Sequence, residues 1–283
     1  MTEIELRDLR SAVSLLENPS FGAKVAHFVG GPIEKAIALL PDQAAKAIVS
    51  ATHKAIRSAL KLSLRTLDRH DPKVDVQAPE ASNWWHVAAT ATTGAVGGAF
   101  GWLALTIELP ISTTIIMRSI ADIARSEGAD LQDLQVQLEC VQVLALGGNS
   151  NRDDSADIGY FVAREAMSKA VSEAASHLAK NGLGKGSSPA IVRLITLIAE
   201  RYSINVTEKA ATQILPVIGA LGGALINTVF IDYFQNMARG HFIVRRLESR
   251  YGAKVVRQNY LDLKLSMSSR QTSESHDQTL DER

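Results

Sequence analysis

Apolar residues recur at spacings of three and four along almost the whole chain, and this period limits the fold more than any other feature. The spacing matches one face of an α-helix, and no stretch alternates apolar and polar residues like a half-buried strand. Hydrophobic residues make up 46% of the chain but aromatic residues only 5%, so the interior must be largely aliphatic. That balance argues against a β-sandwich, a barrel or an aromatic-stacking RNA module. We therefore predict an all-α, multi-helix bundle.

Charge and cysteine content exclude several classes of protein. The 30 basic and 30 acidic residues cancel, which excludes a globally basic nucleic-acid binder and an acidic disordered chain. Cys140 is the single cysteine of the sequence, so an intrachain disulfide and a cysteine-rich zinc site are excluded as well. Residues 1–10 carry five charges and no apolar core of a signal peptide, so we expect a cytoplasmic protein.

Breaks in the apolar period divide the chain into three parts. Residues 71–83 hold two prolines and little apolar content, which is typical of a linker. We therefore expect an N-terminal helical extension over residues 1–82 and a larger helical domain over residues 83–264. The polar residues 265–283 are expected to form a disordered tail.

Turn-forming residues mark helix boundaries within the larger part. Pro110 is expected to kink or end a helix, and Gly128 to follow the end of the next one. Asp130 is then expected to cap a helix over residues 131–146, and a short helix is expected over residues 190–202.

Two apolar segments, residues 84–107 and 210–231, contain no Asp, Glu, Lys or Arg. Glycines four residues apart lie on one helix face, where they allow another helix to approach closely. Three interpretations remain open: close-packed helices in a soluble bundle core, a hairpin that dips into a bilayer, or two membrane spans. The glycines expected to pack helices are Gly94, Gly97, Gly98, Gly101, Gly219, Gly222 and Gly223.

Basic residues concentrate in two places. Lys54, Arg57, Lys61 and Arg65 step by three or four along one helix face, opposite an apolar face. A second cluster follows the second apolar segment, where juxtamembrane basic residues are found in membrane proteins. Each cluster could be a solvated face with acidic partners elsewhere in the fold, a surface for anionic lipid headgroups, or a nucleic-acid contact, which neutral overall charge makes unlikely. The second cluster consists of Arg245, Arg246, Arg250 and Lys254.

Sequence motifs of known catalytic chemistry are missing. No phosphate-binding loop, dinucleotide fingerprint, nucleophile elbow or zinc-binding helix occurs, so we predict no cofactor and no metal. Cys140 lies in an apolar helix and is expected to be a core residue. Glu108 and Asp232 each end an apolar segment, with Arg118 and Asn227 as expected partners. They are candidates for acid/base catalysis, although salt bridges at helix ends are the favoured explanation.

Several ordered blocks resemble the EcsC protein family. They are WWHVAATATTGAVGGAFGWLALTIELPISTTIIMRSIADIARSEGADLQD, ECVQVLALGG and ILPVIGALGGALINTVFIDYFQNMARGHFIVRRLESRYG, which fall within residues 84–260. The resemblance implies an all-helical bacterial protein whose founding member is encoded beside components of an ABC transporter, with no established enzymatic activity. The family's first Gly-rich block often ends in Asp-Leu-Pro, whereas this chain has Glu108, Leu109 and Pro110.

These observations give three functional hypotheses. The first is a non-enzymatic cytoplasmic protein, peripheral to the inner membrane, that serves as an accessory or scaffold to a transport or envelope system. Its partners would be anionic lipid, membrane transport proteins, or both, and insertion of the Gly-rich segments is an open alternative. The second is an enzyme, such as a hydrolase on a lipid-like substrate, that uses Glu108, Asp232 and a histidine. The third is a soluble module whose basic faces bind an acidic protein.

Overall fold

A computed structural model describes residues 1–17, 20–29, 33–66, 101–147, 159–182, 188–212 and 220–281 of the protein. Every regular element within these ranges is a helix, and none is a strand. The all-α, multi-helix bundle predicted from the spacing of apolar residues is therefore confirmed.

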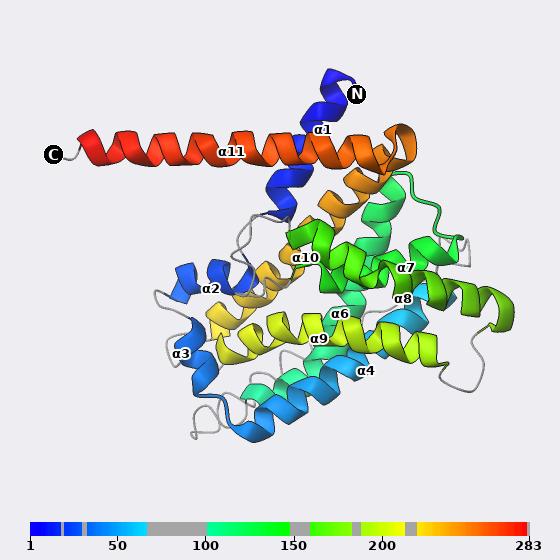
Figure 1. The fold of residues 1–283 in the computed structure, drawn as a ribbon. Coiled ribbons are helices and arrows are strands. Elements are labelled where there is room, and N and C mark those ends of the chain that lie inside the picture. The colour runs from blue at the N-terminus through cyan, green and yellow to red at the C-terminus, as the bar shows by residue number, and fades with distance from the viewer. Residues whose placement is uncertain are drawn as a thin grey trace.

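Ten α-helices and one 3₁₀ turn follow one another in the described ranges. The first four helices are α1 (Glu3–Leu16), α2 (Phe21–Val29), α3 (Ile33–Ala38) and α4 (Asp42–Thr66). They are followed by α6 (Gly101–Ser126), α7 (Leu134–Gln142), the turn η1 (Val143–Ala145) and α8 (Gly159–Asn181). The last three are α9 (Pro189–Thr212), α10 (Ala220–Tyr251) and α11 (Ala253–Asp281), which lies along one end of the molecule and extends beyond it (Figure 1).

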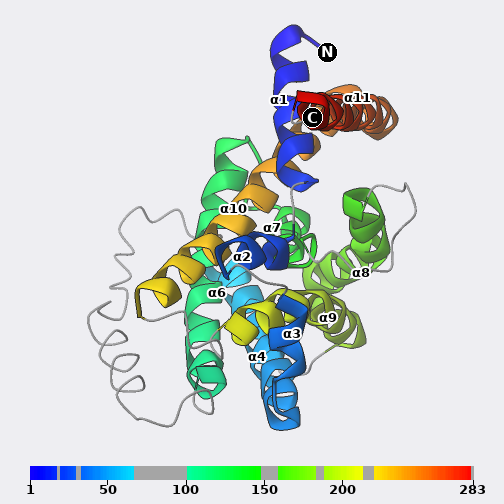
Figure 2. The same ribbon diagram turned by 90° about the vertical axis from the view of Figure 1, so that its left-hand side faces the viewer.

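Helices α6 and α10 lie side by side and run in the same direction, as Figure 2 shows. Two contacts fix this direction: Ser119 of α6 meets Gln235 of α10, and Glu127, just past the end of α6, meets Arg246 further along α10. Helix α4 packs against α6, α7 and α9, whereas α1 packs against α10. The N-terminal helices α1 and α4 thus pack on different helices of the C-terminal part.

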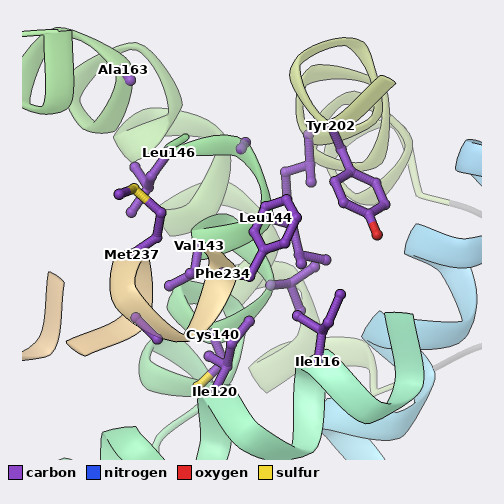
Figure 3. Packing of buried hydrophobic residues seen from close by; sticks show 14 of the residues in the cluster. Ile116, Ile120, Cys140, Val143, Leu144, Leu146, Ala163, Tyr202, Phe234 and Met237 are labelled. Carbon is purple, nitrogen blue, oxygen red and sulfur yellow. The ribbon is translucent and has the colours of Figure 1, made fainter. Parts of the chain in front are cut away.

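The core lies where α6, α7, α9 and α10 meet (Figure 3). Ile116 and Ile120 of α6 and Leu144 of η1 have no exposed surface, and Cys140 is also fully buried. Burial raises the pKa of the Cys140 thiol, as expected of a core residue. Aliphatic side chains fill most of this core, in agreement with the composition.

Most of the buried aromatic rings gather around α10. Phe230 and Phe234 of α10 lie 5.1 Å apart in an edge-to-face arrangement. Tyr202 of α9 packs against Phe234 with ring centroids 5.3 Å apart, and Phe21 of α2 packs against Phe230 at 5.1 Å. Such edge-to-face pairs contribute beyond the apolar area that they bury.

Pro110 lies inside α6, so of the two expected outcomes, a kink or an end of the helix, the second is wrong. Proline removes one backbone donor and costs about 3 kcal/mol in a helix interior. The buried residues on both sides of it, Leu109 and Ile116, hold the helix in place. Tertiary packing therefore outweighs the local preference.

Two other boundaries differ from the prediction. The helix expected over residues 190–202 continues to Thr212, because buried residues recur on the same face to its end. Asp133, not Asp130, is the N-cap of α7, where its side chain accepts a hydrogen bond from the Gln135 N–H. Asp130 instead accepts from the Gln132 N–H in the preceding turn. Gly128 has a φ of 83° and follows the end of α6, as predicted.

Helix α11 continues to Asp281, through residues for which the sequence analysis expects a disordered tail. Gly252, with a φ of 84°, separates it from α10. No glycine or proline occurs from Ala253 onward, so nothing in the local sequence ends the helix. Its first turns are anchored: Val256 and Tyr260 are fully buried.

Candidate functional site

A buried ion pair joins α6, α9 and α10. The Nζ of Lys209, a residue that is 2% exposed, donates to Oε1 of Glu108 at 2.6 Å and to Oδ1 of Asn227 at 2.8 Å. The same atom lies 4.7 Å from the centroid of the Phe230 ring. The ammonium group thus meets a carboxylate, an amide oxygen and an aromatic face. We name Glu108, Lys209, Asn227 and Phe230 the lysine cluster.

Burial dominates the electrostatics of the lysine cluster. It lowers the pKa of Lys209, and the Glu108 carboxylate opposes this effect. Beside the cluster, the Tyr202 hydroxyl lies 2.9 Å from the Thr113 hydroxyl, and burial raises the pKa of this tyrosine. Glu108 is the charged member that reaches the surface, with 18% of its side chain exposed. The arrangement buries a cation against one carboxylate and leaves that carboxylate in contact with solvent.

Only one of the two predicted catalytic candidates lies in this cluster. Glu108 does, whereas Asp232 is exposed on α10 and acts electrostatically on Lys24 of α2. Among the described residues no hydrogen bond or ion pair joins the two carboxylates. Of their expected partners, Asn227 shares Lys209 with Glu108, and Arg118 pairs with neither in the described part of the chain.

Three members of the second basic cluster lie on the C-terminal half of α10 and form ion pairs with acidic side chains, most of them from other parts of the chain. Its fourth member, Lys254, lies in the first turn of α11 and is exposed. We name these three the α10 arginines. Arg245 pairs with Glu139 at 3.0 Å and with Glu248 at 3.3 Å. Arg246 pairs with Asp8 and Glu127 at 2.9 Å each, and Arg250 pairs with Glu5.

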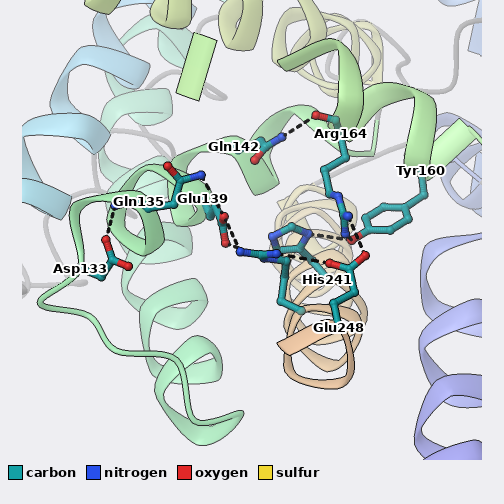
Figure 4. A network of polar contacts seen from close by, with 9 residues as sticks. Asp133, Gln135, Glu139, Gln142, Tyr160, Arg164, His241 and Glu248 are labelled. Carbon is teal, nitrogen blue, oxygen red and sulfur yellow. Dashed lines mark hydrogen bonds and ion pairs between the residues drawn. The ribbon is translucent and has the colours of Figure 1, made fainter. Parts of the chain in front are cut away.

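Arg245 belongs to a polar network that ties α7 and α8 to α10 (Figure 4). It binds both carboxylate oxygens of Glu139, while Arg164 of α8 donates to Glu248 at 2.7 Å. Arg164 also donates to the Tyr160 hydroxyl, which lies 2.9 Å from Nδ1 of His241. Burial and the two nearby arginines hold the pKa of His241 well below its ordinary value, so the imidazole is neutral. The buried carboxylates of Glu139 and Glu248 thus balance the positive charges of Arg164 and Arg245.

The first basic cluster lies on the exposed side of α4. Lys54, Arg57 and Lys61 are exposed and form no ion pair with any residue that the structure describes. We name these three the α4 stripe. The opposite side of the helix, which includes Ile56 and Leu60, is buried. The side chain of Arg65, the fourth predicted member, lies outside the described residues.

The glycine packing hypothesis remains a prediction. Gly94, Gly97, Gly98 and Gly219 lie outside the described residues. Gly101 begins α6, and Gly222 and Gly223 lie in the first turn of α10. The packing around these three also lies outside what the structure describes.

Comparison with known proteins identifies the family to which the chain belongs. The model of the EcsC protein family matches residues 7–247. The chain belongs to the EcsC protein family. No curated protein and no solved structure matches it. The matched range extends the resemblance seen in residues 84–260 to the N-terminal helices, and it ends inside α10, so that α11 lies outside it.

Sequence reasoning missed Lys209 and the network around His241 in this EcsC protein. Lys209 had a signal, since it is the last charged residue before the second apolar segment and lies four residues after Asn205 on the same helix face. Tyr160 and Arg164 are also four apart, and His241 and Glu248 seven apart. These spacings indicate a shared face but not which faces meet.

The described residues contain neither a candidate membrane span nor a candidate metal site. None of their helices combines the length and the apolar character of a membrane-spanning helix. No three His, Cys, Asp or Glu side chains there are grouped so as to hold a metal ion.

Proposed function

We propose that this EcsC protein is a non-enzymatic helical accessory protein that binds an anionic membrane surface through the α4 stripe. The observation that carries the proposal is the exposure of Lys54, Arg57 and Lys61 with no ion pair among the described residues. After Asp42 the helix contains no acidic residue. These cations therefore keep their charge for an external partner.

The attraction of the α4 stripe to an anionic membrane would give weak, reversible binding. A basic residue close to an anionic leaflet contributes about 1 kcal/mol, so three contribute about 3 kcal/mol. Leu39, just before α4, is 66% exposed. Shallow insertion of this apolar side chain would add to the electrostatic attraction.

The α10 arginines are excluded from this role in our proposal. Their charges are matched by acidic side chains of the same chain, so that they offer little net charge to a lipid headgroup. The binding surface is therefore assigned to α4, at the inner face of the membrane. The protein would act there as an accessory or scaffold to a transport or envelope system, as the family resemblance implies.

The enzymatic alternative needs Glu108, Asp232 and a histidine in one pocket. Glu108 instead binds Lys209, and Asp232 is exposed on α10. The buried His241 belongs to the network of α7, α8 and α10. The described residues thus offer a charge-balanced structural cluster in place of that pocket, which favours the accessory role.

Vesicle co-sedimentation tests the proposal. The full chain is mixed with vesicles of phosphatidylcholine alone or with 30% phosphatidylglycerol (an amount on the order of that in bacterial membranes), at low and high salt. Wild type should pellet with the anionic vesicles at low salt and be released by high salt. The triple variant Lys54→Glu, Arg57→Glu, Lys61→Glu should bind more weakly by at least about a hundredfold, because the attraction of about 3 kcal/mol is lost and repulsion replaces it.

A matched triple variant separates local from global charge. Arg10→Glu, Lys180→Glu and Arg239→Glu reverse three exposed cations on α1, α8 and α10, with the same change in net charge. This variant should bind nearly as wild type does. Recovery of wild type in the supernatant with both vesicle types would overturn the proposal. Salt-sensitive capture of an acidic protein by the α4 stripe, without vesicle binding, would support the soluble binding module instead.

A further inference from the structure

The carboxyl group of Glu208, next to Lys209 on α9, packs directly on the start of α2. A Cβ atom added to Gly22 would lie 2.6 Å from Oε1 of Glu208, so a side chain at residue 22 would displace the carboxyl group from this position. The carboxyl group accepts a hydrogen bond from the Gly22 backbone N–H. Its other oxygen, Oε2, is buried and has no hydrogen-bond partner among the described residues. One oxygen thus holds α2, and the other is left without a donor.

Helix α2 covers part of the lysine cluster. Phe21 and Val25 of α2 have no exposed surface. The Phe21 ring meets the edge of Phe230, whose ring also lies against Nζ of Lys209. Glu208, which holds α2, and Lys209, at the centre of the lysine cluster, are therefore neighbours in sequence. Movement of α2 away from α9 and α10 would uncover Phe230.

Titratable groups of the neighbouring helices surround the contact between Glu208 and α2. Glu34 of α3 is the nearby like charge. Helix α2 itself carries Lys24 and His27, and Asp232 of α10 acts electrostatically on Lys24. Tyr233 of α10 lies within the field of both Glu208 and Arg201 of α9. Burial and then Glu34 raise the pKa of Glu208 to about 7, against the opposing effect of the Gly22 N–H.

We propose that α2 is a pH-sensitive cap over the lysine cluster, and that ionisation of Glu208 loosens its docking on α9 and α10. An ionised Glu208 leaves a charged oxygen buried without a donor and close to Glu34. A neutral carboxyl group removes both costs. The stabilisation of the docked α2 is therefore complete below the ordinary carboxyl pKa near 4.5 and is lost as the pH rises from there through about 7.

Hydrogen exchange of the full chain at pH 6 and pH 8 tests the cap, after correction for the intrinsic exchange rates. Linkage between a docked pKa of about 7 and an ordinary pKa near 4.5 predicts about a tenfold loss of protection for α2 amides over this interval. Amides of α6 serve as the internal reference and should not change. In Glu208→Gln the α2 amides should have the same protection at both pH values.

Two further variants keep the test decisive. Glu34→Gln should retain a loss of protection but complete it at lower pH, because removing the nearby like charge lowers the pKa of Glu208. The loss between pH 6 and pH 8 should therefore be smaller than in wild type. Glu165→Gln, an exposed change on α8, should behave as wild type. Equal α2 protection at pH 6 and pH 8 in wild type would overturn the proposal. Unchanged pH dependence in Glu208→Gln would overturn it too, because the effect would then come from a group other than Glu208.

Discussion

The α4 stripe and the α10 arginines are equally basic in sequence but differ in what surrounds them. Lys54, Arg57 and Lys61 face solvent without an acidic partner among the described residues. Each α10 arginine meets at least one carboxylate from another part of the chain. The difference shows that a run of basic residues predicts a binding surface only when the fold supplies no counter-charge.

The ion pairs of the α10 arginines differ in exposure. Arg245, whose side chain is 38% exposed, pairs with carboxylates that are 7% and 4% exposed. Arg246, 31% exposed, pairs with carboxylates that are 36% and 18% exposed, and Arg250, 63% exposed, pairs with Glu5, which is 6% exposed. With both partners taken together, exposure forms a gradient that increases in this order. The cost of losing a pair should follow it, because water screens exposed charges.

Reversal of the innermost pair should have the largest effect on stability. Arg245→Glu places a third carboxylate beside Glu139 and Glu248, both buried, and should lower the free energy of unfolding by about 3 kcal/mol. Arg57→Glu on the α4 stripe should change it by less than about 0.5 kcal/mol. Urea unfolding of both variants measures the difference. An equally large loss in Arg57→Glu would mean that the α4 stripe has a partner within the fold.

A double-mutant cycle should find a smaller coupling at the intermediate pair. Arg246→Met and Glu127→Gln, alone and together, should give a coupling energy of about 1 kcal/mol, since both side chains are partly exposed. The control is the fully surface pair of Asp122 and Arg125 on α6, whose side chains are 72% and 66% exposed. Its coupling should be about 0.3 kcal/mol. Equal couplings at the two pairs would contradict the gradient.

The helices themselves could be read from the sequence, because burial on one side imposes the three-to-four spacing locally. Gly128 illustrates this success, since a C-terminal glycine acts through its own backbone. Pro110 illustrates the limit, because the packing of Leu109 and Ile116 overrides the local rule. Local chemistry predicts elements well where no tertiary contact opposes it.

Partners could not be read from the sequence, because they depend on which helices meet. Arg246 and Asp8 are 238 residues apart, and Arg245 and Glu139 are 106 apart. Glu108 was found as a candidate because it ends a charge-free segment, but its partner Lys209 lies 101 residues away. Periodicity gives each residue a face on its own helix and does not say which face it meets.

The outermost pair should depend least on its arginine. Glu5 accepts hydrogen bonds from the Tyr251 hydroxyl at 2.6 Å and the Thr2 backbone N–H at 2.7 Å, besides its pair with Arg250. These bonds, with Tyr251 first, hold the pKa of Glu5 at about 2. A depressed pKa stabilises the fold above the ordinary value near 4.5, and this contribution is lost as the pH falls from there towards 2.

Carbon-detected NMR titration of the Glu5 carboxyl group would therefore rank its partners. Tyr251→Phe should raise the pKa of Glu5 more than Arg250→Met does, because the tyrosine bond is the larger cause and Arg250 is mostly solvated. Thr2→Ala retains the backbone N–H and should have a small effect. A larger shift of the Glu5 pKa in Arg250→Met would mean that even an exposed α10 arginine acts mainly through its ion pair. The contrast between paired α10 arginines and the unpaired α4 stripe would then hold at the protein surface as well.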